Sequence, residues 1–167
     1  LRSAAALDCI AAIASQRPQM TVGAGTVLTP AQMQAAKDAG AAFAVSPGAY
    51  PDLIKAWAAG DLPLLPGAAT ASEMMALMAA GLTEMKFFPA AVAGGIDYLR
   101  AVASPFADAV FCPTGGISAE TAADWLALSN VACVGGTWVA PRDLLAAGDF
   151  ATITARAKAC QHLSGRP

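Results

Sequence analysis

The chain has 167 residues, of which 56% are apolar and 13% are charged, and its formal net charge at pH 7 is −2. No apolar run approaches the roughly 18–20 residues that a membrane-spanning helix needs, and no basic cluster indicates a nucleic-acid or anionic-membrane surface. These values predict one soluble globular domain, residues 1–167, that acts on a small molecule and has neither a nucleic-acid nor a membrane partner.

The cysteines and the single histidine do not form a pattern that binds metal. Cys9, Cys112, Cys133 and Cys160 are far apart in the sequence, and His162 lies close to its end. Zinc sites need paired ligands at short spacing, so the sequence does not favour a metal site. Widely spaced cysteines in an alanine-rich chain without a visible signal segment are typical of reduced thiols in a bacterial-type cytoplasm.

Apolar spacing and turn residues predict an alternation of helices and strands. The predicted strand segments are Met20–Thr26, Ala42–Gly48, Leu62–Gly67, Leu82–Ala90, Ala109–Gly116 and Val131–Gly136. A helix over Ala4–Gln16 precedes them. The next three helices are predicted to end at Gly40, Gly60 and Gly81. A further helix covers about Asp97–Ala103, another ends at about Leu128, and a final helix pair follows. Their predicted starts are Thr29 with Pro30, Ser72 with Glu73, and Ser118.

The strand centres recur at nearly constant spacing. If they are Val22, Phe43, Leu64, Lys86, Phe111 and Cys133, the separations are 21, 21, 22, 25 and 22 residues. Apolar strands with helices between them indicate an α/β fold with a parallel sheet, either open and doubly wound or closed as a (β/α)8 TIM barrel. Every strand ends in a glycine, proline or hydroxyl motif, which favours the barrel.

Only six βα units are visible in the chain. Closure of a barrel would need two more, so we expect about 40–45 residues before Leu1 at this period. We also expect a gap for two strands beside the strand at Met20–Gly25.

Lys86 is the one lysine of four that lies in a predicted strand; Lys37, Lys55 and Lys158 lie in predicted helices. A lysine in an apolar, desolvated site has a lowered pKa, and its free amine can attack a carbonyl carbon to form a Schiff base. The alternative is a core lysine that pairs with Glu84, two residues earlier on the same strand face.

Paired glycines follow the last two predicted strands. They lie in Thr114–Ser118 and in Gly135–Thr137, where backbone amides can approach a phosphate that also faces a helix N-terminus. The alternative is that these glycines only make tight βα turns. Thr26 and Thr114 also stand at strand ends, where each hydroxyl can hold a substrate group or cap the next helix.

These motifs resemble those of the 2-keto-3-deoxy-6-phosphogluconate (KDPG) aldolases of the Entner–Doudoroff pathway, which are class I Schiff-base aldolases. The resemblance runs from Leu1 to about His162. It rests on segments that stand in the family's order and spacing: Val22–Leu28, Phe43–Gly48, Leu64–Gly67, Lys86–Ala90, Phe111–Ser118 and Gly135–Trp138.

The resemblance implies that Lys86 is the Schiff-base lysine of a lyase that cleaves KDPG to pyruvate and glyceraldehyde 3-phosphate. It implies that Arg2 and Thr26 contact the pyruvate portion of the substrate, and that Pro47 and Thr114 are further substrate-binding residues. Relatives also cleave 4-hydroxy-2-oxoglutarate, so the substrate breadth is open. The family's iminium intermediate needs no metal or organic cofactor, and the family forms homotrimers.

By the same resemblance, Gly115, Gly116, Gly136 and Thr137 form the phosphate site. Thr137 stands where the family usually has serine, a change that keeps the hydroxyl and adds one methyl group. The family's general base is a glutamate on a strand that would precede Leu1. Glu84 does not replace it, because it lies toward the start of the strand, and we expect it to be structural.

Two other functions fit the same pattern. One is a phosphate-binding barrel isomerase or synthase, in which Lys86 is an electrostatic group. The other is a non-catalytic barrel that binds a phosphorylated metabolite; it would keep both glycine loops but would not need a desolvated lysine in a strand.

Overall fold

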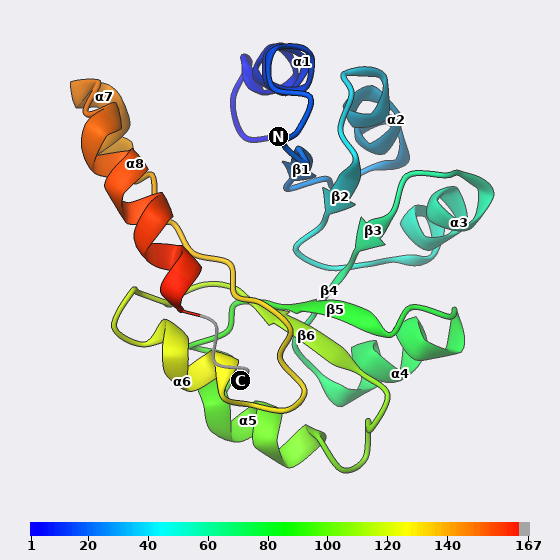
Figure 1. Ribbon diagram of the computed structural model, residues 1–167. Helices are drawn as coiled ribbons and strands as arrows, with labels where there is room; N and C mark the ends of the chain where they lie inside the picture. The colour runs from blue at the N-terminus through cyan, green and yellow to red at the C-terminus, as the bar shows by residue number, and fades with distance from the viewer. Residues whose placement is uncertain (164–167) are drawn as a thin grey trace. The chain divides into compact units, whose positions relative to one another are not determined.

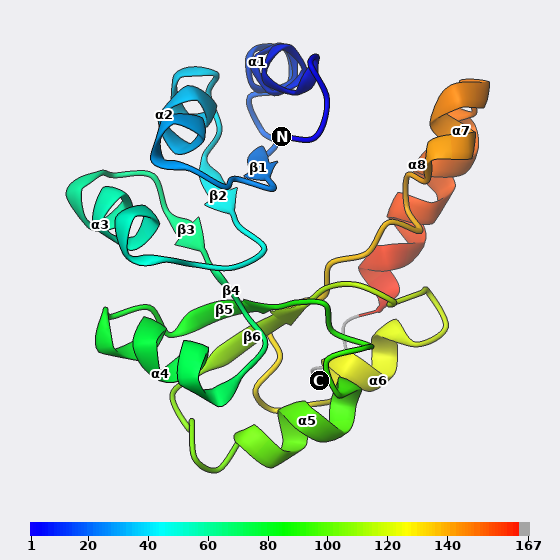
Figure 2. The same cartoon turned by 180° about the vertical axis from the view of Figure 1, so that it is seen from behind.

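The computed structural model describes residues 1–163, so the last four residues of the predicted domain lie outside the described part (Figures 1 and 2). The chain divides into two compact units, unit 1 (Leu1–Lys86) and unit 2 (from Phe87 onward). The boundary lies inside strand β5 (Glu84–Phe87). Across residues 1–163, no helix has the length and apolar character to cross a membrane.

Unit 1 alternates helices with short parallel strands. Its elements are α1 (Ala6–Gln16), β1 (Gly23–Gly25), α2 (Pro30–Asp38), β2 (Phe43–Val45), α3 (Pro51–Ala59), β3 (Leu64–Leu65), β4 (Gly67–Ala68), α4 (Ala71–Ala79) and β5 as far as Lys86. Strands β1, β2 and β3 pair in this order and run parallel. The predicted α/β class with parallel strands is therefore confirmed.

One face of the β1-β2-β3 sheet packs against helices. Ala24 and Ala44 are at most 1% exposed and belong to one buried cluster with Met33 of α2 and Leu53 of α3. Small side chains on the strands let the helices approach closely, and Figure 1 shows α2 and α3 alongside the sheet. Truncation of Leu53, which is 1% exposed, to alanine would cost about 2–5 kcal/mol because it removes buried apolar atoms and leaves a cavity.

The helix starts agree with the sequence at α2 and differ at α4. The Thr29 hydroxyl accepts a hydrogen bond from the Gln32 amide over 3.1 Å, and Pro30 is the first helical residue, as predicted. The predicted start at Ser72 is wrong, because Thr70 is the N-cap of α4. The Thr70 hydroxyl accepts from the Glu73 amide and the Glu73 carboxylate accepts from the Thr70 amide, and this reciprocal pair requires the spacing T-x-x-E.

Unit 2 contains the end of β5, α5 (Gly95–Val102), β6 (Val110–Pro113), α6 (Ala122–Leu126), α7 (Arg142–Ala147), α8 (Phe150–Ala159) and a 3-10 turn (Cys160–His162). The Thr114 amide donates to the Phe87 carbonyl over 2.9 Å, which joins β6 to β5. The Phe87 ring stacks on Tyr98 of α5 with a centroid distance of 5.4 Å. The predicted final helix pair is confirmed as α7 and α8.

Two predictions for unit 2 are wrong. The continuous strand Val131–Gly136 is reduced to two isolated parallel bridges, which pair Phe111 with Val131 and Thr114 with Gly135. Four residue steps on one side face three on the other, so one extra residue interrupts the ladder. Ser118 does not cap the next helix either: α6 begins only at Ala122, and the Ser118 amide donates to the Thr121 hydroxyl over 3.0 Å.

Candidate functional site

Lys86 lies in β5, as predicted, and is the only lysine of residues 1–163 that lies in a strand. Its neighbours Met85 and Phe87 are both 0% exposed, whereas Lys86 is half-buried. Because side chains alternate along a strand, Lys86 points to the face opposite these two apolar side chains. The apolar character of the segment therefore belongs to the other face of β5.

Glu84 shares the Lys86 face of β5. Its side chain is exposed, and its carboxylate accepts a hydrogen bond from the Thr83 hydroxyl over 3.1 Å. The structural role expected for Glu84 therefore stays a prediction.

The carboxyl ends of the strands in unit 1 lie at one edge. The register places Gly25 opposite Val45, and Val45 opposite Leu65. The next residues along these strands are Thr26, Ser46 and Pro66, so they also end at this edge. The Lys86 amide donates to the Pro66 carbonyl over 2.8 Å, which aligns Lys86 with the same row.

Pro47 and Arg2 extend this row. The Pro47 carbonyl packs so closely on Gly67 that a Cβ there would stand 2.1 Å from its oxygen, so glycine is required. The backbone nitrogen of Leu1 donates to the Gly25 carbonyl, which holds the backbone of Arg2 near Thr26, while the Arg2 side chain is exposed. Unit 1 thus places the backbones of Arg2, Thr26, Pro47 and Lys86 along one edge of its strands, and their roles in binding stay a prediction.

Thr26 has a strained backbone. Its φ is 59°, the only positive φ among the non-glycine residues that the structure describes. This conformation is a genuine outlier for a β-branched side chain, and such strain is concentrated at functional sites. Thr26 does not cap α2, since Thr29 does so, and the capping alternative is therefore wrong for Thr26.

In unit 2, Thr114 is held at the end of β6. Its hydroxyl donates to the Cys112 carbonyl over 3.3 Å and lies 3.9 Å from the Cys112 sulfur. Gly135 leaves room for it, because a Cβ there would stand 2.4 Å from the Thr114 oxygen. Thr114 therefore does not cap a helix either.

The predicted phosphate loops present unused amides. Within residues 1–163, the backbone N–H groups of these four residues donate no hydrogen bond to the protein: Gly115, Gly116, Gly136 and Thr137. The Gly115 carbonyl is fixed by the Ala91 amide over 3.0 Å, so this loop is held while its amides are open. Unused amides on a fixed loop can bind an anion.

The glycines also have packing reasons. Gly116 has φ 78°, and a Cβ there would stand 2.5 Å from that of Ala91. At Gly136 a Cβ would overlap the Trp138 ring, 1.6 Å from its Cζ3 atom. A close turn and a phosphate cradle are therefore compatible at the same positions.

Sequence reasoning missed two features near these residues. The Glu73 carboxylate accepts from the amides of Ala69 and Thr70 and from the Thr70 hydroxyl, each over 2.9 Å, and so fixes the loop that follows Pro66. The T-x-x-E spacing would have identified it. The Cys112 thiol donates a hydrogen bond to Cys133 and lowers the pKa of the Cys133 thiol to about 7. The sequence does not indicate this contact, because the pairing of the segments that carry the two cysteines is interrupted.

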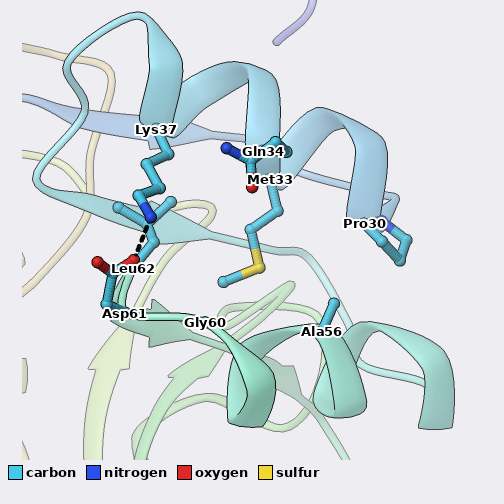
Figure 3. Close-up of a pocket in the computed structure, with 8 residues that line it drawn as sticks. All are labelled: Pro30, Met33, Gln34, Lys37, Ala56, Gly60, Asp61 and Leu62. Atoms are coloured by element: carbon cyan, nitrogen blue, oxygen red, sulfur yellow. Dashed lines mark ion pairs between the residues drawn. The ribbon is translucent and has the colours of Figure 1, made fainter.

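A small pocket between α2 and α3 does not match a substrate site (Figure 3). Its volume is about 70 Å³, and the ion pair between Lys37 and Asp61 lies beside it. Ligand pockets usually measure roughly 300–1,000 Å³. Within residues 1–163, no group of three or more His, Cys, Asp or Glu side chains is placed to hold a metal ion.

Comparisons with known proteins agree with one another. The family model described as "Aldolase: KDPG and KHG aldolase" matches residues 1–156. The KHG/KDPG aldolase of Escherichia coli (strain K12) is 51% identical over 158 residues, which cover 95% of this chain and 74% of that protein. The 2-dehydro-3-deoxy-phosphogluconate aldolase of Pseudomonas aeruginosa is 46% identical, and the match covers 92% of this chain and 70% of that protein.

Two solved structures are also similar. KDPG aldolase from Legionella pneumophila, with pyruvate captured as a covalent carbinolamine intermediate, has a TM-score of 0.91 and 41% identity over 93% of this chain and 76% of that chain. The 2-keto-3-deoxy-6-phosphogluconate aldolase of Zymomonas mobilis ZM4 with 3-phosphoglycerate has a TM-score of 0.91 and is 42% identical. The match covers 98% of this chain and 76% of that chain.

Proposed function

The chain belongs to the KDPG and KHG aldolase family, and from this we propose that it cleaves KDPG to pyruvate and glyceraldehyde 3-phosphate through a Schiff base on Lys86. The observation that carries the proposal is the position of Lys86 in β5, in the row formed with Thr26, Pro47 and Pro66. The covalent pyruvate adduct in the Legionella pneumophila relative supports it.

The chemistry begins when the Lys86 amine attacks the C2 ketone of the substrate to form a carbinolamine. Loss of water gives a protonated imine, which accepts the electron pair of the C3–C4 bond as that bond breaks. The C4 hydroxyl gives up its proton to a base, and glyceraldehyde 3-phosphate leaves. The remaining enamine takes a proton at C3, and hydrolysis of the imine releases pyruvate and regenerates the lysine. The iminium is the electron sink, so the reaction needs neither a metal nor an organic cofactor.

Substrate binding has two parts in this proposal. Arg2, Thr26, Pro47 and Thr114 bind the pyruvate portion. A second set binds the phosphate through backbone amides that donate no hydrogen bond within residues 1–163: Gly115, Gly116, Gly136 and Thr137. The Zymomonas mobilis relative with 3-phosphoglycerate supports a phosphorylated ligand in this family. A relative that is 36% identical is named as a 4-hydroxy-2-oxoglutarate aldolase. This substrate has no phosphate, so its cleavage would use only the residues that bind the pyruvate portion.

The remaining parts of the proposal concern the whole protein. We propose that its strands close into a single (β/α)8 barrel domain, that three copies associate, and that the protein acts in the cytoplasm in the Entner–Doudoroff pathway. Parallel β1, β2 and β3 with intervening helices support the barrel.

A coupled assay tests the activity. Purified protein is mixed with KDPG, and pyruvate is followed by NADH oxidation with lactate dehydrogenase. We expect turnover in the wild-type protein and in the control Lys55→Met, which removes an exposed lysine of α3. Lys86→Met should fall to the assay background. Turnover that survives in Lys86→Met would contradict the proposed mechanism.

A further inference from the structure

Arg156 makes a contact that the proposed mechanism does not use. Its guanidinium Nη1 donates a hydrogen bond to the Trp138 carbonyl over 2.6 Å, across 18 residues of sequence. Hydrogen bonds from a charged donor are shorter and stronger than those between neutral groups. The contact ties α8 to the backbone directly after Gly136 and Thr137.

Trp138 is contacted both at its ring and at its backbone carbonyl. Its ring occupies the space that Gly136 leaves, where a Cβ would stand 1.6 Å from Cζ3. Trp138 also lines a small hollow of about 90 Å³ together with Arg156 and Cys160. The backbone oxygen and the ring of one residue are therefore both fixed, and the conformation of the turn before it is fixed with them.

The helix that carries Arg156 has a capped N-terminus. The Asp149 carboxylate caps α8, accepting from the Thr152 amide over 3.0 Å and from the Thr152 hydroxyl over 2.7 Å. These bonds, and the nearby charge of Arg156, hold the pKa of Asp149 below its usual value. Arg156 thus projects from a helix whose first turn is closed by a side-chain cap.

We propose that Arg156 is a positioning residue for the phosphate group of the substrate, which it serves by holding the turn Gly136–Trp138 in the conformation that binds the anion. The inference rests on the proposed function. Without the contact, the turn would have to become ordered as phosphate binds, and that ordering would weaken the affinity. The amine chemistry at Lys86 does not depend on this turn, so a substrate without phosphate should be unaffected.

The test compares two substrates in matched variants. Arg156→Met keeps an apolar stem and removes the donors, and Lys158→Met is the control, because it removes the same charge from the same helix. We expect Arg156→Met to raise the KM for KDPG about three- to tenfold, as for one lost hydrogen bond from a charged group near solvent. The inhibition constant of inorganic phosphate should rise by a similar factor. The kcat for KDPG, and both constants for 4-hydroxy-2-oxoglutarate, should match the control.

Borohydride trapping of pyruvate on Lys86 in the wild-type protein separates this inference from the proposed function. If trapping fails, the proposed function fails. If trapping succeeds, equal losses on both substrates, or an unchanged phosphate inhibition constant, would overturn the role of Arg156 alone. Should Arg156→Met not fold by circular dichroism, Arg156→Gln carries the same comparison, since its shorter side chain keeps this helix position polar.

Discussion

The amide of Lys86 donates a hydrogen bond to the carbonyl oxygen of Pro66 over 2.8 Å, so the strand that carries the lysine is fixed to the end of its neighbour. The loop after Pro66 is fixed in turn by Glu73. The position of Lys86 therefore depends on a carboxylate that does not need to touch the substrate.

Removal of the Glu73 carboxylate should loosen this loop. Glu73→Ala loses three hydrogen bonds, and we expect a loss of about 1 kcal/mol in the free energy of unfolding, as for other caps. Denaturant unfolding measures it. Thr70→Ala should cost a similar amount, and the double variant should cost less than the sum, because both residues belong to one network. Strict additivity would contradict the reciprocal cap.

The same carboxylate predicts a pH dependence. Hydrogen bonds from Ala69 and Thr70 lower the pKa of Glu73 below 4.5 in the folded protein, although partial burial opposes them. Its contribution to stability is therefore fully present above pH 4.5 and is lost as pH falls through the lower, folded value. Wild-type protein and Glu73→Gln should differ less in stability at acid pH than at pH 7.

Substitutions of Thr26 should affect stability and activity in different ways. Thr26→Gly removes the cost of φ 59°, which is about 1–3 kcal/mol, and should leave the unfolding free energy unchanged or higher. It also removes the hydroxyl, so kcat/KM should fall for both KDPG and 4-hydroxy-2-oxoglutarate. Thr26→Ser is the control, because it keeps the hydroxyl. Full activity in Thr26→Gly would show that the hydroxyl does not bind the pyruvate portion.

Gly116 should affect phosphate binding more than chemistry. Gly116→Val places a side chain against Ala91 at φ 78°, so the loop must move and its amides turn away from the anion. The KM for KDPG should rise far more than the KM for 4-hydroxy-2-oxoglutarate. Gly148→Ala is the control for backbone strain alone, since its φ is 67° and no atom lies within 4 Å of the added Cβ. Equal losses on both substrates would mean that Gly116 only shapes the fold.

The thiol of Cys133 should react at neutral pH. With a pKa of about 7, half of it is thiolate there, and its rate of alkylation by iodoacetamide should reach half-maximum near pH 7. Cys112→Ala removes the donor and should move this midpoint toward the ordinary value of 9.0. Because the folded pKa is the lower one, this ionisation stabilises the fold at alkaline pH and the effect is lost as pH falls through 7. A midpoint that does not move in Cys112→Ala would contradict the thiol pair.

The sequence predicts most strands of unit 1, because apolar runs bounded by glycine or proline leave few alternatives. It predicts the place of Lys86 for the same reason. The single strand predicted over Leu62–Gly67 is wrong, since this segment divides into β3 and β4, which belong to different sheets. The sequence also fails at Val131–Gly136, where one extra residue interrupts the ladder, since periodicity does not report on pairing with a distant strand. The contact between Arg156 and Trp138 leaves no signal at all, because it joins an exposed side chain to a backbone oxygen 18 residues away.

The most direct test of the account is reduction of the protein with borohydride in the presence of pyruvate, followed by peptide mass mapping. Only an imine is reduced to a stable secondary amine under these conditions, so the label identifies the nucleophile. The account predicts one adduct, on Lys86. An adduct on Lys37, Lys55 or Lys158 instead, or no adduct in protein that turns over KDPG, would contradict it.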